Sequence, residues 1–233
     1  MEGAPAEGQT RTLTGTDAMH IAKTLRMRPG ETLILCDGKG LDGACTILKV
    51  SSGSVEVRVD AVFPNRAEPP IRVVLLCGYP KADRAEHIAQ KAVELGAAEI
   101  VFFLSERSVA RPDDFTKKRE RLERIVREAA MQSGRGVIPP VRGLLSEDEA
   151  FREAAGYTLP LFFFEHGGEA LRTLPMGTDA ALVTGPEGGF SDAEVERARA
   201  MGLRVASLGP RILRCETAPL AALAAVLYAS GAL

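Results

Sequence analysis

The second part of the chain alternates short apolar strands with helices, and this alternation restricts the fold more than any other feature. From residue 71 onward, strand character is clear in "IRVVLLCG", "EIVFFLS", "LPLFFFE", "AALVTGP" and "RVASLG". Between and after them, helices are expected at 84–96, 115–132 and 191–201 and from Ala218. Strands separated by helices form βαβ units, so the pattern predicts an α/β domain with a mostly parallel sheet.

The first part of the chain has a different rhythm. Residues 12–63 are short β-branched runs between Gly, Ser and Asp turns, with one helix expected around 17–27. Such a pattern predicts a small β-barrel. The segment "PNRAEPP" at 64–70 stops both strand and helix because of its prolines, and it is typical of a linker. We therefore expect two domains, 1–68 and 69–233.

Composition excludes several classes of protein. The chain has 29 Lys and Arg against 31 Asp and Glu, a net charge of −2, so RNA binding would need local clusters of cations. The four Cys are scattered without a CxxC, which favours neither a metal site nor a disulfide framework. No secretory signal pattern begins the chain, and no apolar run approaches the roughly 20 residues of a membrane span. We expect a cytoplasmic protein with neither a metal nor a membrane partner.

The loop "TGPEGG" at 184–189 marks a candidate site. It follows a predicted parallel strand, and ligands of open α/β sheets bind at the carboxyl ends of strands. Ser191 and Glu194 form a capping box that begins the next helix, so the glycines belong to the loop itself. The loop lacks both the GxGxxG spacing and the Lys of a phosphate loop. A plain strand-to-helix turn is the alternative to a binding loop.

A second unusual segment, "SLGPRILRCETAPLAALAAVLYASGAL", ends the chain. Its "LGP" closes a strand, and "RILR" places two guanidiniums around two aliphatic residues. The helix that follows is almost wholly Ala, Leu and Val, so it must be buried. We expect it to form a homodimer interface, and the alternative is a core helix of a monomer.

Both late segments, "GPEGGFSDAEVERARAMG" and "SLGPRILRCETAPLAAL", resemble the signature of the SPOUT RNA methyltransferases. The resemblance is to the ribosomal small subunit RNA methyltransferase E family, which methylates N3 of a uridine in 16S rRNA. "HIAKTLRMRPGE", "KADRAEHIAQKAVELGAAEIVFFLSERSV" and "REAAMQSGRGVIPPV" agree in family order, from about Arg11 to Leu227. The resemblance implies a PUA-like RNA-binding β-barrel and then a SPOUT α/β domain with a C-terminal trefoil knot, acting as a homodimer.

The resemblance also implies S-adenosylmethionine as cofactor and 16S rRNA of the small ribosomal subunit as partner. The residues expected to bind the cofactor are Thr184, Gly185, Pro186, Glu187, Gly188, Gly189, Leu208, Gly209, Ile212, Leu213, Arg214, Thr217 and Ala218. N3 of uridine is protonated at neutral pH, so its proton must leave or the developing anion must be stabilised. Arg211, Arg214 and Glu216 are the candidate catalytic residues, with Glu187 as a second carboxylate. The alternative for both glutamates is bonding to loop amides.

The residues expected to contact RNA are Arg11, His20, Arg26, Lys81, Arg84, Lys91, Arg107, Arg111, Gln132 and Arg135. The sequence departs from the family in its acidic N-terminus, in Cys215 where Thr is usual, and in Met131 where an acidic residue is common. Two other functions stay open: methylation of another atom such as the ribose 2′-oxygen, and a non-catalytic RNA-binding or assembly role.

Overall fold

The computed structural model describes residues 4–112, 114–171 and 177–233, which divide into two compact units. The first unit holds the residues up to Glu68 together with Gly134–Ile138. The second holds Pro69–Ser133 and Pro139–Leu233. The sequence analysis expected 134–138 in the second domain, because nothing in the local pattern shows that the chain returns. No helix in the described ranges is long and apolar enough to span a membrane.

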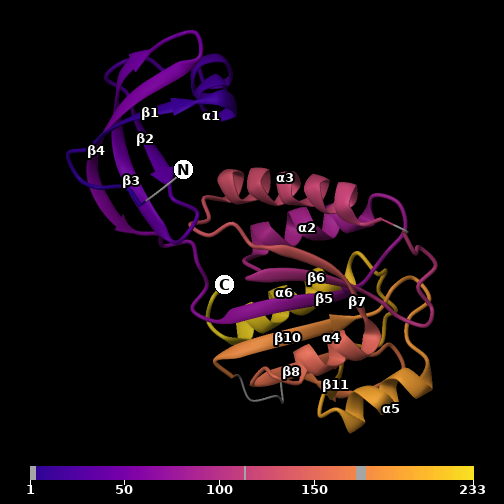
Figure 1. Cartoon of the computed structure of the whole chain (residues 1–233). Helices are drawn as coiled ribbons and strands as arrows, with labels where there is room; N and C mark the ends of the chain where they lie inside the picture. The colour runs from indigo at the N-terminus through magenta and orange to yellow at the C-terminus, as the bar shows by residue number, and fades with distance from the viewer. Residues whose placement is uncertain (1–3, 113, 172–176) are drawn as a thin grey trace. The chain divides into compact units, whose positions relative to one another are not determined.

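The first unit is built on a four-stranded antiparallel sheet in the order β1-β4-β3-β2 (Figure 1). Its elements are β1 (Thr10–Thr14), α1 (Gly15–Met19), a π-helical turn (His20–Thr24), β2 (Thr32–Cys36), β3 (Leu41–Val50) and β4 (Ser54–Pro64). Alternate residues of β4, including Val55, Val57 and Val59, are fully buried and pack with Ile47. The helix expected at 17–27 ends early, because Arg26 has a left-handed backbone with φ of 55°.

The segment 134–138 is fixed to this unit by three kinds of contact. The carbonyl of Gly136 accepts hydrogen bonds from the amide of Gly40 at 2.8 Å and from the thiol of Cys36 at 3.1 Å. Val137 forms a β-bridge with Lys39. The Arg135 guanidinium pairs with Glu68 at 2.6 Å. The segment therefore completes the first unit as an added edge piece.

The second unit is built on a seven-stranded sheet in the order β7-β6-β5-β10-β8-β11-β9, and every strand pair in it is parallel. Its strands are β5 (Arg72–Gly78), β6 (Glu99–Leu104), β7 (Val141–Ser146), β8 (Leu159–Phe163), β9 (Glu169–Ala170), β10 (Asp179–Thr184) and β11 (Arg204–Ser207). Its helices are α2 (Arg84–Leu95), α3 (Thr116–Ser133), α4 (Glu147–Ala154), α5 (Asp192–Ala200) and α6 (Ala218–Ala229). The prediction of an α/β fold with a parallel sheet is confirmed.

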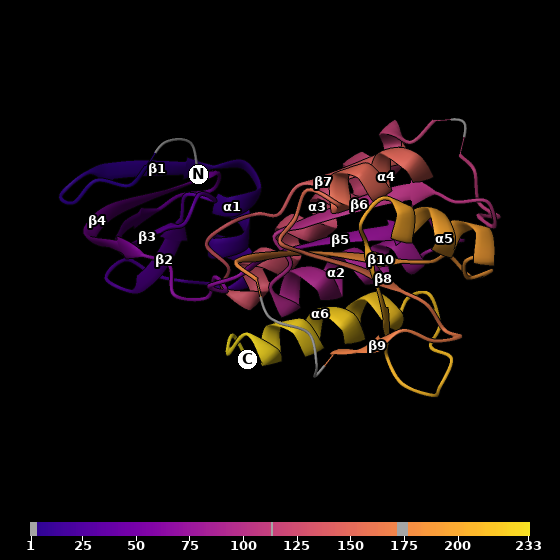
Figure 2. The same ribbon diagram turned by 90° about the horizontal axis from the view of Figure 1, so that it is seen from below.

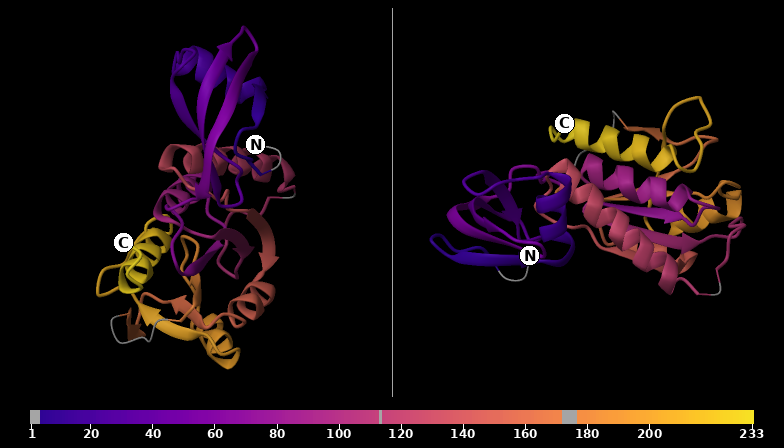
Figure 3. Two further views of the ribbon diagram at one scale, coloured as in Figure 1. Left: turned by 90° about the vertical axis from the view of Figure 1, so that its left-hand side faces the viewer. Right: turned by 90° about the horizontal axis from the view of Figure 1, so that it is seen from above.

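Helices cover both faces of this sheet, which explains its continuously apolar strands. Helices α4 and α5 pack on one face, where Phe151, Phe162 and Phe190 are clustered in the core (Figure 2). Helices α2 and α6 lie side by side on the other face, and α3 packs against α2 (Figure 3). The order of the central strands brings β5, β10, β8 and β11 together, so their carboxyl ends form one edge.

Three elements of this unit were missed by the sequence analysis: β7, α4 and the two-residue strand β9. The segment of β7, "VRGLLS", contains a glycine and a charge and is only partly buried, so it lacks a strong strand pattern. Helix α4 has only eight residues. A readable signal was nevertheless present, because Ser146 and Glu149 form a complete capping box at its N-terminus.

Candidate functional site

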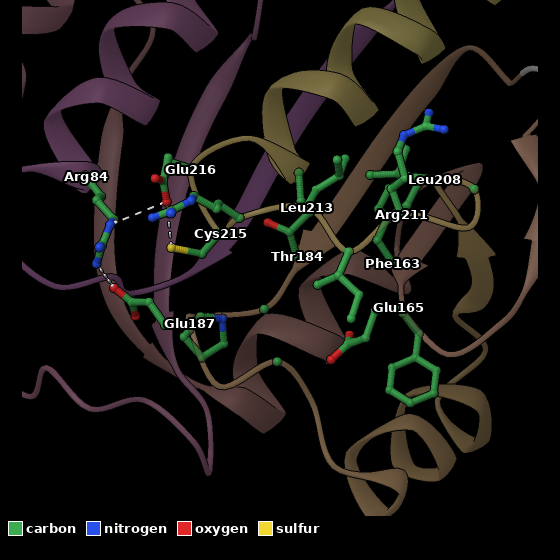
Figure 4. A pocket seen from close by; sticks show the side chains of 18 residues that line it. Arg84, Phe163, Glu165, Thr184, Glu187, Leu208, Arg211, Leu213, Cys215 and Glu216 are labelled. Atoms are coloured by element: carbon green, nitrogen blue, oxygen red, sulfur yellow. Dashed lines mark hydrogen bonds and ion pairs between the residues drawn. The ribbon is translucent and has the colours of Figure 1, made fainter.

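A pocket of about 350 Å³ lies at the carboxyl ends of β8, β10 and β11 (Figure 4). Two segments form most of its wall, and we name them the glycine loop (residues 185–190) and the C-terminal loop (residues 208–217). The predicted cofactor-binding residues all line this pocket except Gly188 and Thr217. The predicted catalytic residues Arg211, Arg214 and Glu216 line it as well. Residues distant in sequence thus lie together at the carboxyl ends of the parallel strands, where the strand pattern predicted a ligand site.

Close packing accounts for the composition of the glycine loop. Gly189 has φ of 62°, a conformation that L-residues adopt at a cost, and a side chain there would begin 2.2 Å from Oε1 of Glu165. Pro186 lies so close to Gly78 of β5 that a β-carbon on Gly78 would be 2.5 Å from the proline ring. The backbone of the loop therefore approaches both neighbouring strands, and larger residues would displace it.

The glycine loop is braced by the segment after β6. The guanidinium of Arg107 donates to the carbonyls of Gly188 at 3.1 Å and Phe190 at 3.3 Å. The amide of Glu106 donates to the Glu194 carboxylate at 3.0 Å, and this carboxylate also accepts from the Ser191 amide at 2.5 Å. The expected capping box of Ser191 and Glu194 is confirmed. It also fixes the segment that braces the loop.

Glu194 forms a buried carboxyl pair with Glu147, the first residue of α4. Neither side chain is more than slightly exposed, and Arg197 donates to Glu147 at 2.5 Å. Burial and the hydrogen bond to Glu194 raise the pKa of Glu147 to about 7, although Arg197 opposes the change. The same pairing, with hydrogen bonds from Ser191 and Glu106, lowers the pKa of Glu194 against the effect of burial. The two carboxyls therefore share one proton near pH 6.

The C-terminal loop places aliphatic and cationic side chains around the pocket. Leu208 and Leu213 line it, and Ile212 is 77% exposed. Arg211 and Arg214 are exposed at its mouth. Thr217 begins α6, but its side chain makes no capping hydrogen bond and does not line the pocket. The loop thus offers both an apolar wall and two cations to a ligand.

Arg84, at the start of α2, is a pocket residue that the sequence analysis assigned to RNA contact. Its Nη1 donates to Glu187 Oε1 at 2.6 Å, and its Nε lies 3.4 Å from Glu216 Oε2 (Figure 4). The backbone amide of Lys81 donates to the same oxygen of Glu187 at 2.8 Å. Burial opposes the ionisation of Glu216 and Glu187, but hydrogen bonds from backbone amides, the Cys215 thiol at Glu216 and, to a smaller extent, the Arg84 guanidinium lower the pKa of each carboxyl overall. Both carboxylates are therefore ionised at neutral pH.

Phe163, Phe164 and Glu165 also line the pocket and were missed as site residues. They end the strand segment "LPLFFFE", and the rule that located the glycine loop, ligands at carboxyl ends of parallel strands, applies to them equally. Cys215 lines the pocket too, and its thiol donates to Glu216 at 3.2 Å. Burial and the neighbouring carboxylates raise the pKa of Cys215 to about 12. The thiol is therefore a neutral part of the wall.

The residues predicted to contact RNA separate into two groups. Arg135 is corrected: its side chain is only 3% exposed and is paired with Glu68, so it supports the first unit and presents no surface to RNA. Arg107 braces the glycine loop, Arg111 donates to the carbonyl of Ser105, and Lys91 pairs with Glu94. Arg11 donates to the side chain of Gln9. Arg107 and Arg111 are exposed despite these bonds, and His20, Arg26, Lys81 and Gln132 are exposed as well.

Comparison with known proteins agrees with this geometry. Residues 67–227 match the family model of the RNA methyltransferase domain, and residues 13–60 match that of the RNA methyltransferase PUA domain. The parallel α/β unit with its pocket and the small antiparallel unit are therefore those of an RNA methyltransferase carrying a PUA domain. The chain is 36% identical to ribosomal RNA small subunit methyltransferase E of Bacillus subtilis, over 95% of this chain and 91% of the relative.

Two solved structures extend the match. The methyltransferase E of Neisseria gonorrhoeae, bound to S-adenosylmethionine, is 31% identical with a TM-score of 0.87, over 98% of this chain and 95% of the other. A methyltransferase of Legionella pneumophila in complex with the same cofactor is 34% identical with a TM-score of 0.88, over 97% and 95%. The chain belongs to the ribosomal RNA small subunit methyltransferase E family.

Proposed function

We propose that the protein transfers a methyl group from S-adenosylmethionine to 16S rRNA of the small ribosomal subunit, at N3 of a uridine. The observation that carries the proposal is the pocket between the glycine loop and the C-terminal loop, in a chain whose relatives are named ribosomal RNA small subunit methyltransferases. Solved structures of two similar proteins hold the cofactor. The trefoil knot implied by the resemblance and a cytoplasmic location belong to the same proposal.

The pocket residues suit a nucleoside with a charged amino-acid end. Oγ of Thr184 is buried on the pocket wall and has no hydrogen-bond partner among the described residues, so it is available to a polar ligand atom. Gly185 and Gly189 line the pocket beside it without side chains, and Leu208 and Leu213 supply an apolar surface for a base. These five residues would hold the cofactor. Among the described residues there is no cluster of three or more His, Cys, Asp or Glu side chains that could hold a metal ion.

When bound, S-adenosylmethionine supplies a methyl group on a sulfonium, which is already activated for displacement. The protein then needs mainly to align two bound reactants, and alignment can lower the barrier by roughly 7 to 11 kcal/mol. Arg211 and Arg214 lie exposed at the mouth, where a base brought in by RNA would arrive. We propose that one of these guanidiniums stabilises the negative charge that develops on the uracil as N3 releases its proton to solvent water.

Glu216 has a narrower role in this scheme than the sequence suggested. Its pKa is lowered, in part by Arg84, so it is an ionised but weak base. An ionised carboxylate beside the base can orient the N3 proton by accepting a hydrogen bond from it. We therefore propose Glu216 as an orienting group and assign the larger share of catalysis to the arginines.

The test is mass spectrometry of 16S rRNA from cells lacking this gene, with and without the purified protein and S-adenosylmethionine. Loss of one 3-methyluridine and its return on addition support the proposal. A missing ribose 2′-O-methyl group would instead identify another target atom. An unchanged set of methylated nucleosides, with rRNA still bound by the protein, would indicate a non-catalytic binding role.

We propose that the protein acts as a homodimer through α6. This helix has no charged residue, and Pro219, Ala222 and Val226 bury one side of it against the second unit. On the opposite side Tyr228 is 75% exposed. An apolar helix that leaves a large aromatic side chain in water is typical of a surface that another chain covers.

A further inference from the structure

Arg84 occupies a position that local helix chemistry disfavours. It is the first residue of α2, where the partial positive charge of the helix N-terminus opposes a cation. The residue two places before it, Ala82, has a left-handed backbone with φ of 54°, which costs a non-glycine residue conformational energy. These two features are both locally unfavourable, so contacts with residues distant in sequence must stabilise the conformation of this segment.

Those contacts join three separate parts of the second unit. Glu187 belongs to the glycine loop after β10, Glu216 to the C-terminal loop after β11, and Arg84 to the helix after β5. One guanidinium reaches both carboxylates, at 2.6 Å and 3.4 Å, and the side chains of all three residues are less than one-third exposed. The amide of Lys81, just before the left-handed residue Ala82, donates to Glu187 as well. Glu187 is thus held by both the backbone and the side chain of one segment.

From this geometry we infer that Arg84 is a positioning residue of the cofactor pocket, holding the glycine loop and the C-terminal loop in one arrangement through Glu187 and Glu216. The inference rests on the proposed function for the identity of the ligand. It replaces the RNA contact that the sequence predicted for Arg84. The charge of this guanidinium is already balanced by two carboxylates, which weakens its attraction for a phosphate, whereas the neighbouring Lys81 side chain is exposed.

The pairing also sets the charge of the wall. Removing the guanidinium would leave two partly buried carboxylates on one side of the pocket, and burial and mutual repulsion would raise their pKa values. In the Arg84→Met variant the pKa of each carboxylate would therefore be higher than in wild type. Lysine keeps the charge but presents a single ammonium group, so it cannot reach both carboxylates as the planar guanidinium does. The Arg84→Lys variant should therefore recover only part of the function.

The experiment is calorimetric titration of S-adenosylmethionine into wild type, Arg84→Met and Arg84→Lys. The control is Arg121→Met, which also removes an ion pair of α2, that with Glu86 at 2.7 Å, but lies outside the pocket. We expect the Kd to rise about tenfold in Arg84→Met, less in Arg84→Lys, and to stay unchanged in the control. Hydrogen exchange of the cofactor-free protein should become faster in both loops in Arg84→Met only.

A pH series separates positioning from a general loss of stability. Between about pH 6 and about pH 8 the ratio of the Arg84→Met Kd to the wild-type Kd should vary with pH, because only the variant lacks the cation that favours the ionised carboxylates. The same ratio for Arg121→Met should be constant, because the Glu147 carboxyl, with a pKa of about 7, titrates in all three proteins. If Arg84→Met bound S-adenosylmethionine with the same Kd as wild type and its two loops exchanged hydrogen at the wild-type rate, the inference would be overturned. So would a loss of affinity for 16S rRNA alone, with cofactor binding intact. A wild-type protein that binds no S-adenosylmethionine would overturn the proposed function itself.

Discussion

The buried carboxyl pair of Glu147 and Glu194 predicts how stability depends on pH. The Glu147 carboxyl has a pKa of about 7 in the folded protein against 4.5 for an unperturbed group. Between these values the folded protein keeps a proton that the unfolded chain releases, so the free energy of unfolding falls as pH rises. Each pH unit is equivalent to about 1.4 kcal/mol, and the interval therefore corresponds to about 3 kcal/mol.

The perturbation is Glu147→Gln, which keeps the shape of the protonated side chain and a donor for Glu194 but cannot ionise. At about pH 4 and below the variant should match wild type, because Glu147 of wild type is then protonated in both the folded and the unfolded chain, and at about pH 8 the variant should be more stable by about 3 kcal/mol. Glu194 has a lowered pKa in the folded protein and makes a separate contribution to the free energy of unfolding. This contribution is present at higher pH and is lost only as the pH falls below about 4.5.

Urea denaturation followed by circular dichroism at several pH values measures the difference. Glu196→Gln is the matched control, because Glu196 lies on α5 with its side chain 69% exposed. Its stability relative to wild type should not change with pH. If Glu147→Gln lost stability with rising pH as steeply as wild type, Glu147 would not hold the proton and the reasoning from burial would be refuted.

Four further predictions concern the second unit. Ala82→Gly should raise the free energy of unfolding by about 0.5 to 1 kcal/mol in urea denaturation, since φ is 54° there; a loss would contradict this. Gly189→Ala should weaken S-adenosylmethionine binding in calorimetry, whereas Gly202→Ala, with positive φ but open space, should not. Arg211→Ala should lower methylation of rRNA with nearly unchanged cofactor Kd, and unchanged turnover would remove Arg211 from the mechanism. Tyr228→Glu should convert a dimer to a monomer in light scattering, and a persisting dimer would exclude α6 as the interface.

The central strands and the glycine loop of the second unit were predictable because each has a strong local sequence pattern. Continuous apolar runs bounded by glycine gave the central strands, and a loop of three glycines followed by a capping box at Ser191 gave one pocket wall. Short or mixed segments were not predictable in this way. The strand β7 and helix α4 together span only 14 residues, 141–154, and their stability comes from Val141, Ala150 and Phe151 packing into a core that other elements form.

Return of the chain to an earlier unit leaves no periodic signal at all. Residues 134–138 belong with the first unit because the carbonyl of Gly136 accepts a hydrogen bond from the amide of Gly40 and because Arg135 forms an ion pair with Glu68. Each of these contacts joins residues about 65 or more positions apart, so no local sequence pattern predicts them. The same applies to Arg84, whose partners Glu187 and Glu216 lie in two later loops.

Arg84 and Arg135 show why an arginine near a loop need not contact RNA. With 31 acidic residues against 29 basic ones, most guanidiniums can find a carboxylate of the same chain. A buried or half-buried arginine that paired with RNA would leave its carboxylate uncompensated, which costs more than the surface contact gains. Arg84 and Arg135 each have such carboxylate partners, and Arg107 is bound to backbone carbonyls. The exposed Lys81 and Arg26 carry no such cost, so they are the stronger candidates for the RNA surface.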